Sequence, residues 1–310
     1  MGKLVKGEWT QAEYLTEDGE FKRWDSVFRN AISTEEGARF APESGRYHLY
    51  VSHACPWAHR AVIMRKLKGL EPHISMDVVH PHMMDNGWEL RSDYDGATGD
   101  RLNGYNYMYQ LYQRAEPEYS GRVTVPTLWD KKEQTIVNNE SAEIIRMFNS
   151  AFDAVTGNHD DYYPAALRAE INAVNERVYE AINNGVYKVG FADTQDAYDK
   201  AIVILFDALD WLESRLSDGR EWLVEDQLTE ADIRLFTTLI RFDSVYYVHF
   251  KCNLRRIADY PHLSAYLNRV YGYDGIADTV NLDHIKQHYY YSHDFLNPKR
   301  IVPAGPVDPL

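Results

Sequence analysis

The stretch that decides the fold is Val51-Ser52-His53-Ala54-Cys55-Pro56-Trp57-Ala58-His59-Arg60. An alternating apolar segment leads into it, which predicts a strand over 47–51. Proline suits the first position of a helix, because its fixed φ fits there and its missing N–H would have no intrahelical partner. We therefore predict a helix over 56–68, with Cys55 as its N-cap.

This helix start has a chemical consequence for the thiol of Cys55. Free N–H groups and the positive end of the helix dipole stabilise a thiolate, and such sites bring a cysteine pKa from about 8.5 to between roughly 3.5 and 7.5. A shift of about two units needs roughly 2.7 kcal/mol, whereas a helix terminus supplies about 0.3 to 1 and at most ~2. We therefore expect further hydrogen-bond donors near Cys55.

The elements that follow predict an α/β domain. A second strand over 74–79 completes a β-α-β unit with a parallel pair. Residues 81–121 are long for an internal loop and are predicted to be an inserted, functional segment. Strands over 126–130 and 135–138 then form a hairpin, and a helix begins near Ser141.

The second half of the chain has helical periodicity throughout. Apolar residues recur at three- and four-residue steps from about residue 160, and Asn183-Asn184-Gly185 reads as a helix stop. Thr229 with Asp232 is a capping-box-like helix start, and Pro261 opens another helix. The prediction is an arm over 1–44, a thioredoxin-like α/β domain over 45–155 and an all-α domain with an extended tail over 160–310.

Composition limits the classes of partner. Lys and Arg total 33 against 47 Asp and Glu, and the net charge of −14 argues against nucleic acid or an anionic membrane. No apolar run approaches the ~18 residues of a spanning helix, and the first residues are too polar for a signal peptide. We expect a soluble, cytoplasmic protein with a small-molecule partner. Two cysteines do not make a disulfide framework, and Cys252 lacks the cues of a reactive thiol.

Glu140-Ser141 is the second candidate site in the sequence. Helix N–H groups and a serine hydroxyl suit a bound α-carboxylate, and a glutamate suits an ammonium group. Glutathione carries both groups at its γ-glutamyl end. Because glutathione is anionic and the chain is acidic, a local positive charge is needed, and Arg122 is the nearest candidate.

A set of motifs spread over the chain is more specific than any one of them. They are Cys55-Pro56-Trp57-Ala58, Asn86-Gly87-Trp88, Arg122-Val123-Thr124-Val125-Pro126, Asn139-Glu140-Ser141, Gly185-Val186-Tyr187-Lys188-Val189-Gly190-Phe191-Ala192, Arg241-Phe242-Asp243-Ser244-Val245-Tyr246 and His284-Ile285-Lys286-Gln287-His288-Tyr289. Together they closely resemble the glutathionyl-hydroquinone reductases, also called xi-class glutathione transferases. The resemblance spans nearly the whole chain and implies a glutathione transferase fold with a cis Val125-Pro126 bond facing the thiol.

The resemblance also implies a reaction and a set of site residues. Glutathione is the co-substrate, S-glutathionyl hydroquinones, chlorinated ones included, are the substrates, no metal is needed, and family members form homodimers. The thiol at the position of Cys55 forms a mixed disulfide with glutathione, which a second glutathione resolves to oxidised glutathione. Trp88, Arg122, Val125, Glu140 and Ser141 match glutathione-binding positions. Tyr187 matches the residue that handles the proton of the departing aromatic group, and Tyr246 and Tyr289 match tyrosines that stabilise the thiolate.

Several alternative interpretations of single residues carry less weight. A lone cysteine in an apolar turn is often a structural thiol. His53, Cys55, His59, His80 and His82 fit no known metal-site spacing, and nothing orients a Cys55–His59 hydrolase pair. Read alone, Trp88 and Tyr187 are ordinary packed aromatics, and Glu140-Ser141 is an ordinary helix cap.

Two rival functions remain open, and so does the identity of two of the assigned tyrosines. The rival functions are an omega-like thiol transferase or dehydroascorbate reductase and a non-catalytic module on the same fold. The ambiguity is that Tyr247 and Tyr290 neighbour two of the assigned tyrosines.

Overall fold

The computed structural model describes residues 2–11, 16–308 and 310, so small parts of the predicted arm and tail lie outside it. By its internal contacts the chain divides into two units. The first comprises residues 2–11, Trp24–Asp160 and Asp278–His288. The second comprises residues 16–23, Asp161–Ala277, 289–308 and 310.

A four-stranded mixed sheet forms the centre of the first unit. Its strands are ordered β6-β5-β8-β9, with bounds β5 Tyr47–Val51, β6 Ser75–Val78, β8 Thr127–Asp130 and β9 Thr135–Asn138. β5 and β6 are parallel, and β8 and β9 form an antiparallel hairpin. The predicted β-α-β unit and hairpin are both confirmed.

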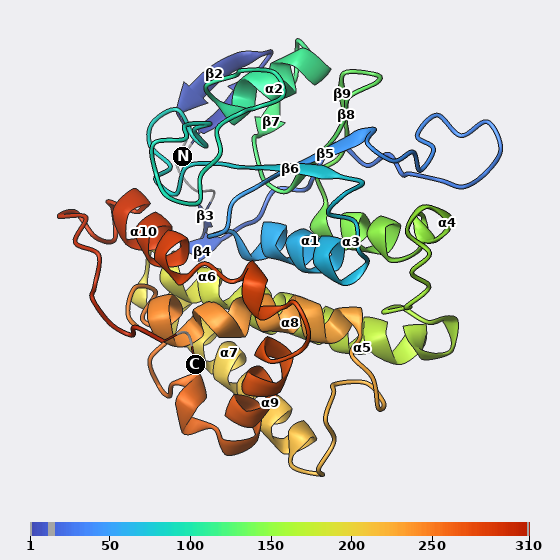
Figure 1. The fold of residues 1–310 in the computed structure, drawn as a ribbon. Coiled ribbons are helices and arrows are strands. Elements are labelled where there is room, and N and C mark those ends of the chain that lie inside the picture. Colours follow the sequence, from blue (N-terminus) through green and yellow to red (C-terminus); the bar gives the residue numbers. More distant parts are fainter. Residues whose placement is uncertain (1, 12–15, 309) are drawn as a thin grey trace. The chain divides into compact units, whose positions relative to one another are not determined.

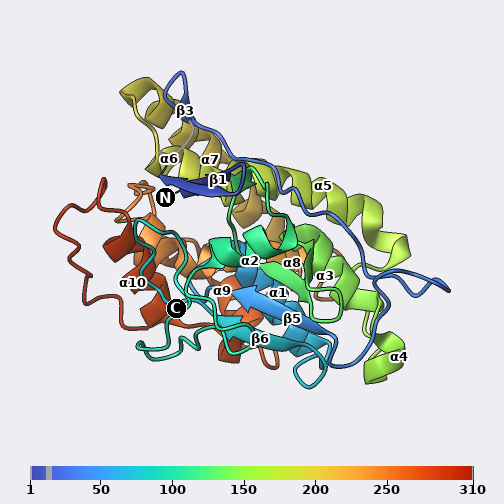
Figure 2. The same cartoon turned by 90° about the horizontal axis from the view of Figure 1, so that it is seen from above.

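Two helices cover one face of this sheet. α1 (Pro56–Leu67) and α3 (Ser141–Ser150) lie side by side on it in Figures 1 and 2. All five residues of β5 are buried. Leu49, Ala58, Ile63 and Ile144 have no exposed surface and belong to the core of this unit. This packing fixes the start of α1 against the sheet, because the two helices bury their apolar faces there.

The inserted segment is more ordered than the sequence predicted. It contains α2 (Met108–Ala115) and ends in the short strand β7 (Gly121–Arg122), two elements that the sequence did not predict. The amphipathic pattern of α2 is only eight residues long, which is short for detection by periodicity. α2 lies across the sheet from α1 (Figure 1).

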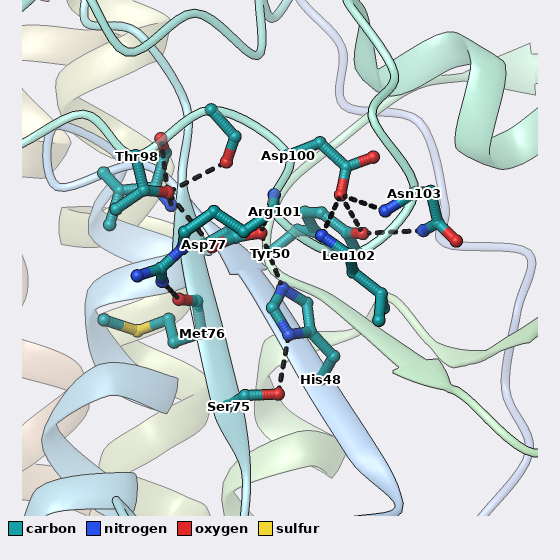
Figure 3. A network of polar contacts seen from close by, with 12 residues as sticks. His48, Tyr50, Ser75, Met76, Asp77, Thr98, Asp100, Arg101, Leu102 and Asn103 are labelled. Atoms are coloured by element: carbon teal, nitrogen blue, oxygen red, sulfur yellow. Dashed lines mark hydrogen bonds and ion pairs between the residues drawn. The ribbon is translucent and has the colours of Figure 1, made fainter.

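A polar network fastens this insertion to the sheet edge (Figure 3). The buried carboxylate of Asp77 on β6 accepts hydrogen bonds from Nε of Arg101 at 2.6 Å and from its backbone N–H at 2.8 Å. His48 lies 3.3 Å from the same carboxylate, and Tyr50 donates to Asp100 at 2.9 Å. His48 and Tyr50 are therefore buried although they alternate with the apolar residues of β5.

The N-terminal segment forms strands that the sequence did not predict. β1 (Gly2–Val5) lies between β2 (Glu8–Gln11) and β7 in a three-stranded sheet. β3 (Thr16–Glu17) and β4 (Glu20–Phe21) form a small hairpin within the second unit. Strands of two to four residues are too short to show a period of two, which explains why the segment read as an irregular arm.

Residues 161–277 of the second unit are helical, as predicted for this half of the chain. α5 and α9 pack against α8, all twelve residues of which are buried. Thr229 and Asp232 form the expected capping box at the start of α8. The helices are α5 Arg168–Val178, η2 Tyr179–Asn183, α6 Gly185–Gly190, α7 Gln195–Leu216, α8 Glu230–Arg241, η3 Phe242–Tyr246 and α9 Pro261–Tyr271.

Four short helices and α10 complete the described helices. The short ones are α4 Asp153–Thr156 and the 3₁₀ turns η1 Ala165–Leu167, η4 Ile257–Asp259 and η5 Ala277–Thr279. α10 spans Leu282–Ser292, and the first unit ends within it at His288. Of the helices described in residues 2–308, none is long and apolar enough to cross a membrane.

The helical segment that begins at Arg168 ends where the sequence predicted a stop, because the π-helix η2 ends at Asn183 and Asn184 is its C-cap. The interruption is short, since α6 begins at Gly185. The side chain of Asn183 contacts α8. It donates to the carbonyl of Arg234 at 3.1 Å and to the hydroxyl of Thr238 at 2.7 Å, both on α8. These hydrogen bonds fasten the end of η2 to α8.

Candidate active site

Cys55 lies at the N-cap of α1 with Pro56 as the first helical residue, as the sequence predicted. Its backbone is extended, at φ −75° and ψ 119°, and its carbonyl accepts the first helical hydrogen bond from His59 at 3.0 Å. The residue is 9% exposed. The thiol donates to the carbonyl of Val125, with 3.4 Å between sulfur and oxygen. Two of the predicted site residues are thus in direct contact.

The Val125-Pro126 bond is cis. It lies between β7 and β8, and the registers of the described sheets do not include Val125. A residue outside the ladders can present its backbone to an extended peptide. The cis bond that the resemblance implied is therefore found beside the thiol, although burial leaves Val125 only 4% exposed.

The start of α3 carries the second pair of predicted residues. Glu140 is the N-cap, and its carboxylate accepts from the N–H of Ala142 at 3.1 Å and from the hydroxyl of Ser26 at 3.1 Å. Ser141 is the first helical residue and is 3% exposed. Glu140 is therefore an ordinary helix cap. It also remains a candidate ligand for a cation, because each carboxylate oxygen can accept more than one hydrogen bond.

Arg122 and Trp88 have their own local partners. Arg122 on β7 donates to the carbonyl of Gly2 at 3.2 Å, and its guanidinium lies 5.8 Å from the ring centre of Trp24. Trp88 in the insertion stacks on His288 with 4.8 Å between ring centres. The ring of His288 is itself held by a 2.9 Å hydrogen bond between Nδ1 and the carbonyl of Pro81. The N-terminal strand and α10 therefore support two candidate residues that the sequence placed far from them.

The three predicted tyrosines form one hydrogen-bonded cluster in the second unit. Tyr289 is its central member, with its hydroxyl 2.6 Å from that of Tyr187 and 3.0 Å from that of Tyr246. All three residues are buried. Burial, and then the neighbouring phenols, raise the pKa of Tyr289 well above its usual value. The cluster therefore holds Tyr289 as a neutral phenol near neutral pH.

The cluster includes Tyr246 and Tyr289 but not their sequence neighbours Tyr247 and Tyr290. Tyr290 donates to the carbonyl of Ser244 at 3.0 Å instead of joining the cluster, and Tyr247 is half-buried. Tyr246 ends the π-helix η3. Widened turns of this kind occur often at functional sites, because they reorient a side chain within a continuous helix.

Sequence reasoning missed two arginines that touch candidate residues. The guanidinium of the buried Arg60 on α1 donates to the hydroxyl of Ser141 at 3.4 Å. The guanidinium of Arg23 lies 5.3 Å from the ring centre of Tyr187, and its Nε donates to Asn184 at 2.8 Å. The sequence offers only one signal for the first, which is that Arg60 stands within the cysteine motif.

The histidines weighed as metal ligands have other contacts. His59 pairs with Thr279 at 2.8 Å. The ring of His53 lies against His284, and His80 lies against His82. Among the residues that the structure describes, no group of three or more His, Cys, Asp or Glu side chains is placed to hold a metal ion.

Comparisons with known proteins identify the family of the chain. Residues 54–151 match the model of the glutathione S-transferase N-terminal domain, and residues 195–269 match that of the C-terminal domain. The glutathionyl-hydroquinone reductase PcpF of Sphingobium chlorophenolicum is 55% identical over 100% of this chain and 98% of its own. The chain belongs to the glutathionyl-hydroquinone reductase family. The resemblance inferred from the sequence motifs is thereby confirmed.

Solved structures extend the comparison to the fold. The glutathione-bound structure of the Escherichia coli glutathione transferase homologue YqjG matches with a TM-score of 0.91 and 51% identity, over 99% of this chain and 96% of that one. A xi-class glutathione transferase from Natrialba magadii matches with a TM-score of 0.94 and 48% identity, over 99% and 94%. The predicted glutathione transferase fold is therefore correct.

Proposed function

We propose that this protein is a glutathione-dependent reductase of S-glutathionyl hydroquinones, chlorinated ones included. The observation that carries the proposal is Cys55 at a helix start, in contact with the residue before a cis proline. It occurs in a chain 55% identical to a named glutathionyl-hydroquinone reductase. A single cysteine suffices for this chemistry, and position 58 is alanine where a dithiol enzyme carries its second cysteine.

The first half-reaction breaks the bond between sulfur and the aromatic ring. The Cys55 thiolate attacks the glutathione sulfur, and a disulfide forms between them. The electron pair of the broken carbon–sulfur bond passes to the ring carbon, which takes a proton from Tyr187 and leaves as hydroquinone. A neutral phenol is a suitable acid here, and the hydrogen bond to Tyr289 supports the new phenolate.

The second half-reaction regenerates the thiolate. A glutathione thiolate attacks the glutathione sulfur of the mixed disulfide, the two glutathiones leave joined as oxidised glutathione, and Cys55 departs as thiolate. The sum is one S-glutathionyl hydroquinone and one glutathione converted to one hydroquinone and one oxidised glutathione.

Glutathione would be held by groups of the first unit. The start of α3 and the hydroxyl of Ser141 suit the α-carboxylate, and the carboxylate of Glu140 suits the ammonium group. The backbone of Val125 suits the cysteinyl residue beside the thiol. Trp88 and Arg122 complete the proposed set by their match to family positions. Tyr246 and Tyr289 are proposed to stabilise the Cys55 thiolate.

We also propose that the protein is cytoplasmic and works as a homodimer without a metal. The chain has only two cysteines, and neither forms a disulfide in the described structure, which supports a reducing compartment. The dimer rests on family membership.

A panel of substrates tests the proposal against its rivals. Hydroquinone release from a synthetic S-glutathionyl hydroquinone is measured with glutathione present, beside dehydroascorbate and a simple mixed disulfide. We expect fast release by the wild type and by Cys252→Ala, which alters a buried thiol, but none by Cys55→Ala. Dehydroascorbate or disulfide reduction without hydroquinone release would favour the omega-like function. An inert thiol would favour a binding module.

A further inference from the structure

Arg60 is a buried cation within the cysteine motif. It lies on α1, five residues after Cys55, and only 1% of its surface is exposed. Its guanidinium lies 4.5 Å from the ring centre of Trp57, one helical turn earlier. Nη1 reaches across to α3 and lies 3.4 Å from the hydroxyl oxygen of Ser141. The helix that carries the thiol thus contacts the helix start proposed to hold glutathione.

This contact fixes what the serine hydroxyl can do. A guanidinium has N–H donors and no acceptor, so Ser141 must be the acceptor in the pair. The hydroxyl proton therefore points away from Arg60 and stays available as a donor. An incoming carboxylate, which only accepts hydrogen bonds, is the matching partner for that proton.

The charge of Arg60 answers a second requirement of the site. The chain has a net charge of −14, and Glu140 stands next to Ser141. An anionic group at the start of α3 therefore meets a negative field unless a cation lies close. A buried charge is screened less than an exposed one, so its field at a neighbouring helix start is stronger. Arg122, the cation that the sequence suggested, is engaged by Gly2 and Trp24.

We propose that Arg60 is a positioning residue for glutathione, which turns the Ser141 hydroxyl toward the γ-glutamyl α-carboxylate and provides the positive field there. The inference rests on the proposed function, because it concerns the same glutathione. It assigns a role to the arginine of the Cys-Pro-Trp-Ala-His-Arg motif and explains the tryptophan beside it, whose ring covers the guanidinium.

The test compares two ligands on the purified full chain by calorimetry. One ligand is glutathione, and the other is its analogue that lacks only the γ-glutamyl α-carboxylate. For Arg60→Met we expect glutathione to bind about tenfold more weakly, as for a lost charge-assisted interaction. Binding of the analogue should change less than about twofold, because the group that Arg60 serves is missing.

Arg65→Met is the matched control. Arg65 lies on the same helix and is 9% exposed, but its Nε donates to the carbonyl of Ile74 at 2.7 Å. We expect this variant to bind both ligands like the wild type. If Arg60→Met does not fold, Arg60→Lys takes its place, since it keeps the charge but loses the planar fork. Arg60→Lys should weaken glutathione binding by less than Arg60→Met does, and should again affect glutathione more than the analogue.

Three outcomes would overturn the proposal. They are unchanged glutathione binding by the Arg60 variant, equal weakening of both ligands, and an equal effect of the Arg65 control. Wild-type protein that binds neither ligand would instead contradict the proposed function, and the inference would fall with it.

Discussion

At the scale of single residues, Tyr289 determines how the tyrosine cluster can act. Its hydroxyl is hydrogen-bonded to those of Tyr187 and Tyr246. In the proposed reaction Tyr187 gives up a proton, and the hydrogen bond to Tyr289 would stabilise the phenolate that remains. The raised pKa of Tyr289 keeps it protonated for this role.

We expect Tyr289→Phe to lower the rate of hydroquinone release by about tenfold, because the phenolate of Tyr187 loses its donor. The free energy of unfolding should fall by about 1 kcal/mol for the lost hydrogen bonds. Turnover and urea unfolding measure the two effects.

Tyr290→Phe is the control for Tyr289→Phe. It removes a buried hydroxyl from the next residue of α10, where the partner is the carbonyl of Ser244. It should cost stability without lowering the rate. An equal loss of rate in both variants would show that the cluster has no specific part in the chemistry.

At the scale of elements, the Asp77 network holds the insertion to strand β6 (Figure 3). Burial opposes the charge of Asp77, but hydrogen bonds from His48 and Arg101 outweigh it and lower its pKa to about 2. Hydrogen bonds to a buried charge are worth roughly 1.5–3 kcal/mol each. The network therefore makes residues 98–106 part of the folded domain and not a free loop.

Removal of this carboxylate should loosen the insertion. We expect Asp77→Ala to reduce the free energy of unfolding by about 2–4 kcal/mol, because Arg101 and His48 lose their shared partner. Hydrogen exchange should become faster over 98–106 before it does in α1. Asp95→Ala, an exposed carboxylate of the same insertion, is the control. Exchange that rises equally in both variants would rule out a fastening role.

His80, at the start of the insertion, makes the stability of the protein depend on pH. Burial first, and then the nearby Arg91 and His82, lower the pKa of His80 to about 4. The unfolded chain therefore binds a proton on this histidine at higher pH than the folded chain. Its contribution to stability is complete above about pH 6.5 and is lost as the pH falls toward 4, by up to about 3 kcal/mol.

The prediction is that His80→Gln flattens the dependence of unfolding free energy on pH between 7 and 4. His262→Gln replaces an exposed histidine and should leave the wild-type slope unchanged. Denaturant unfolding at each pH measures the slopes. A wild-type slope in the His80 variant would assign the acid sensitivity to other groups.

At the scale of the whole molecule, the sequence predicted what local patterns encode. The strand before Cys55, the proline at the helix start, the hairpin and the helical second half all follow from short-range signals and agree with the structure. The N-terminal strands could not be predicted from short-range signals, because β1 pairs with β7 across about 120 residues of sequence.

Some residues of the candidate site could likewise be predicted from the sequence, and others could not. Cys55 and Ser141 could be found from their places at helix starts, and the tyrosines from the family resemblance. The contact between Arg60 and Ser141 joins residues 81 positions apart, so no local pattern contains it. The same holds for the contact of His288 with Trp88. Such contacts are set by tertiary packing, and for Arg60 the only signal in the sequence is its place within the cysteine motif.

The most direct test of the central claim is a single turnover without free glutathione. Enzyme is mixed with one equivalent of S-glutathionyl hydroquinone, and released hydroquinone and the intact mass of the protein are measured together. We predict one hydroquinone per active site and a protein heavier by one glutathione, with peptide mapping placing the addition on Cys55. Hydroquinone release without any protein adduct, or an adduct on Cys252, would contradict the account.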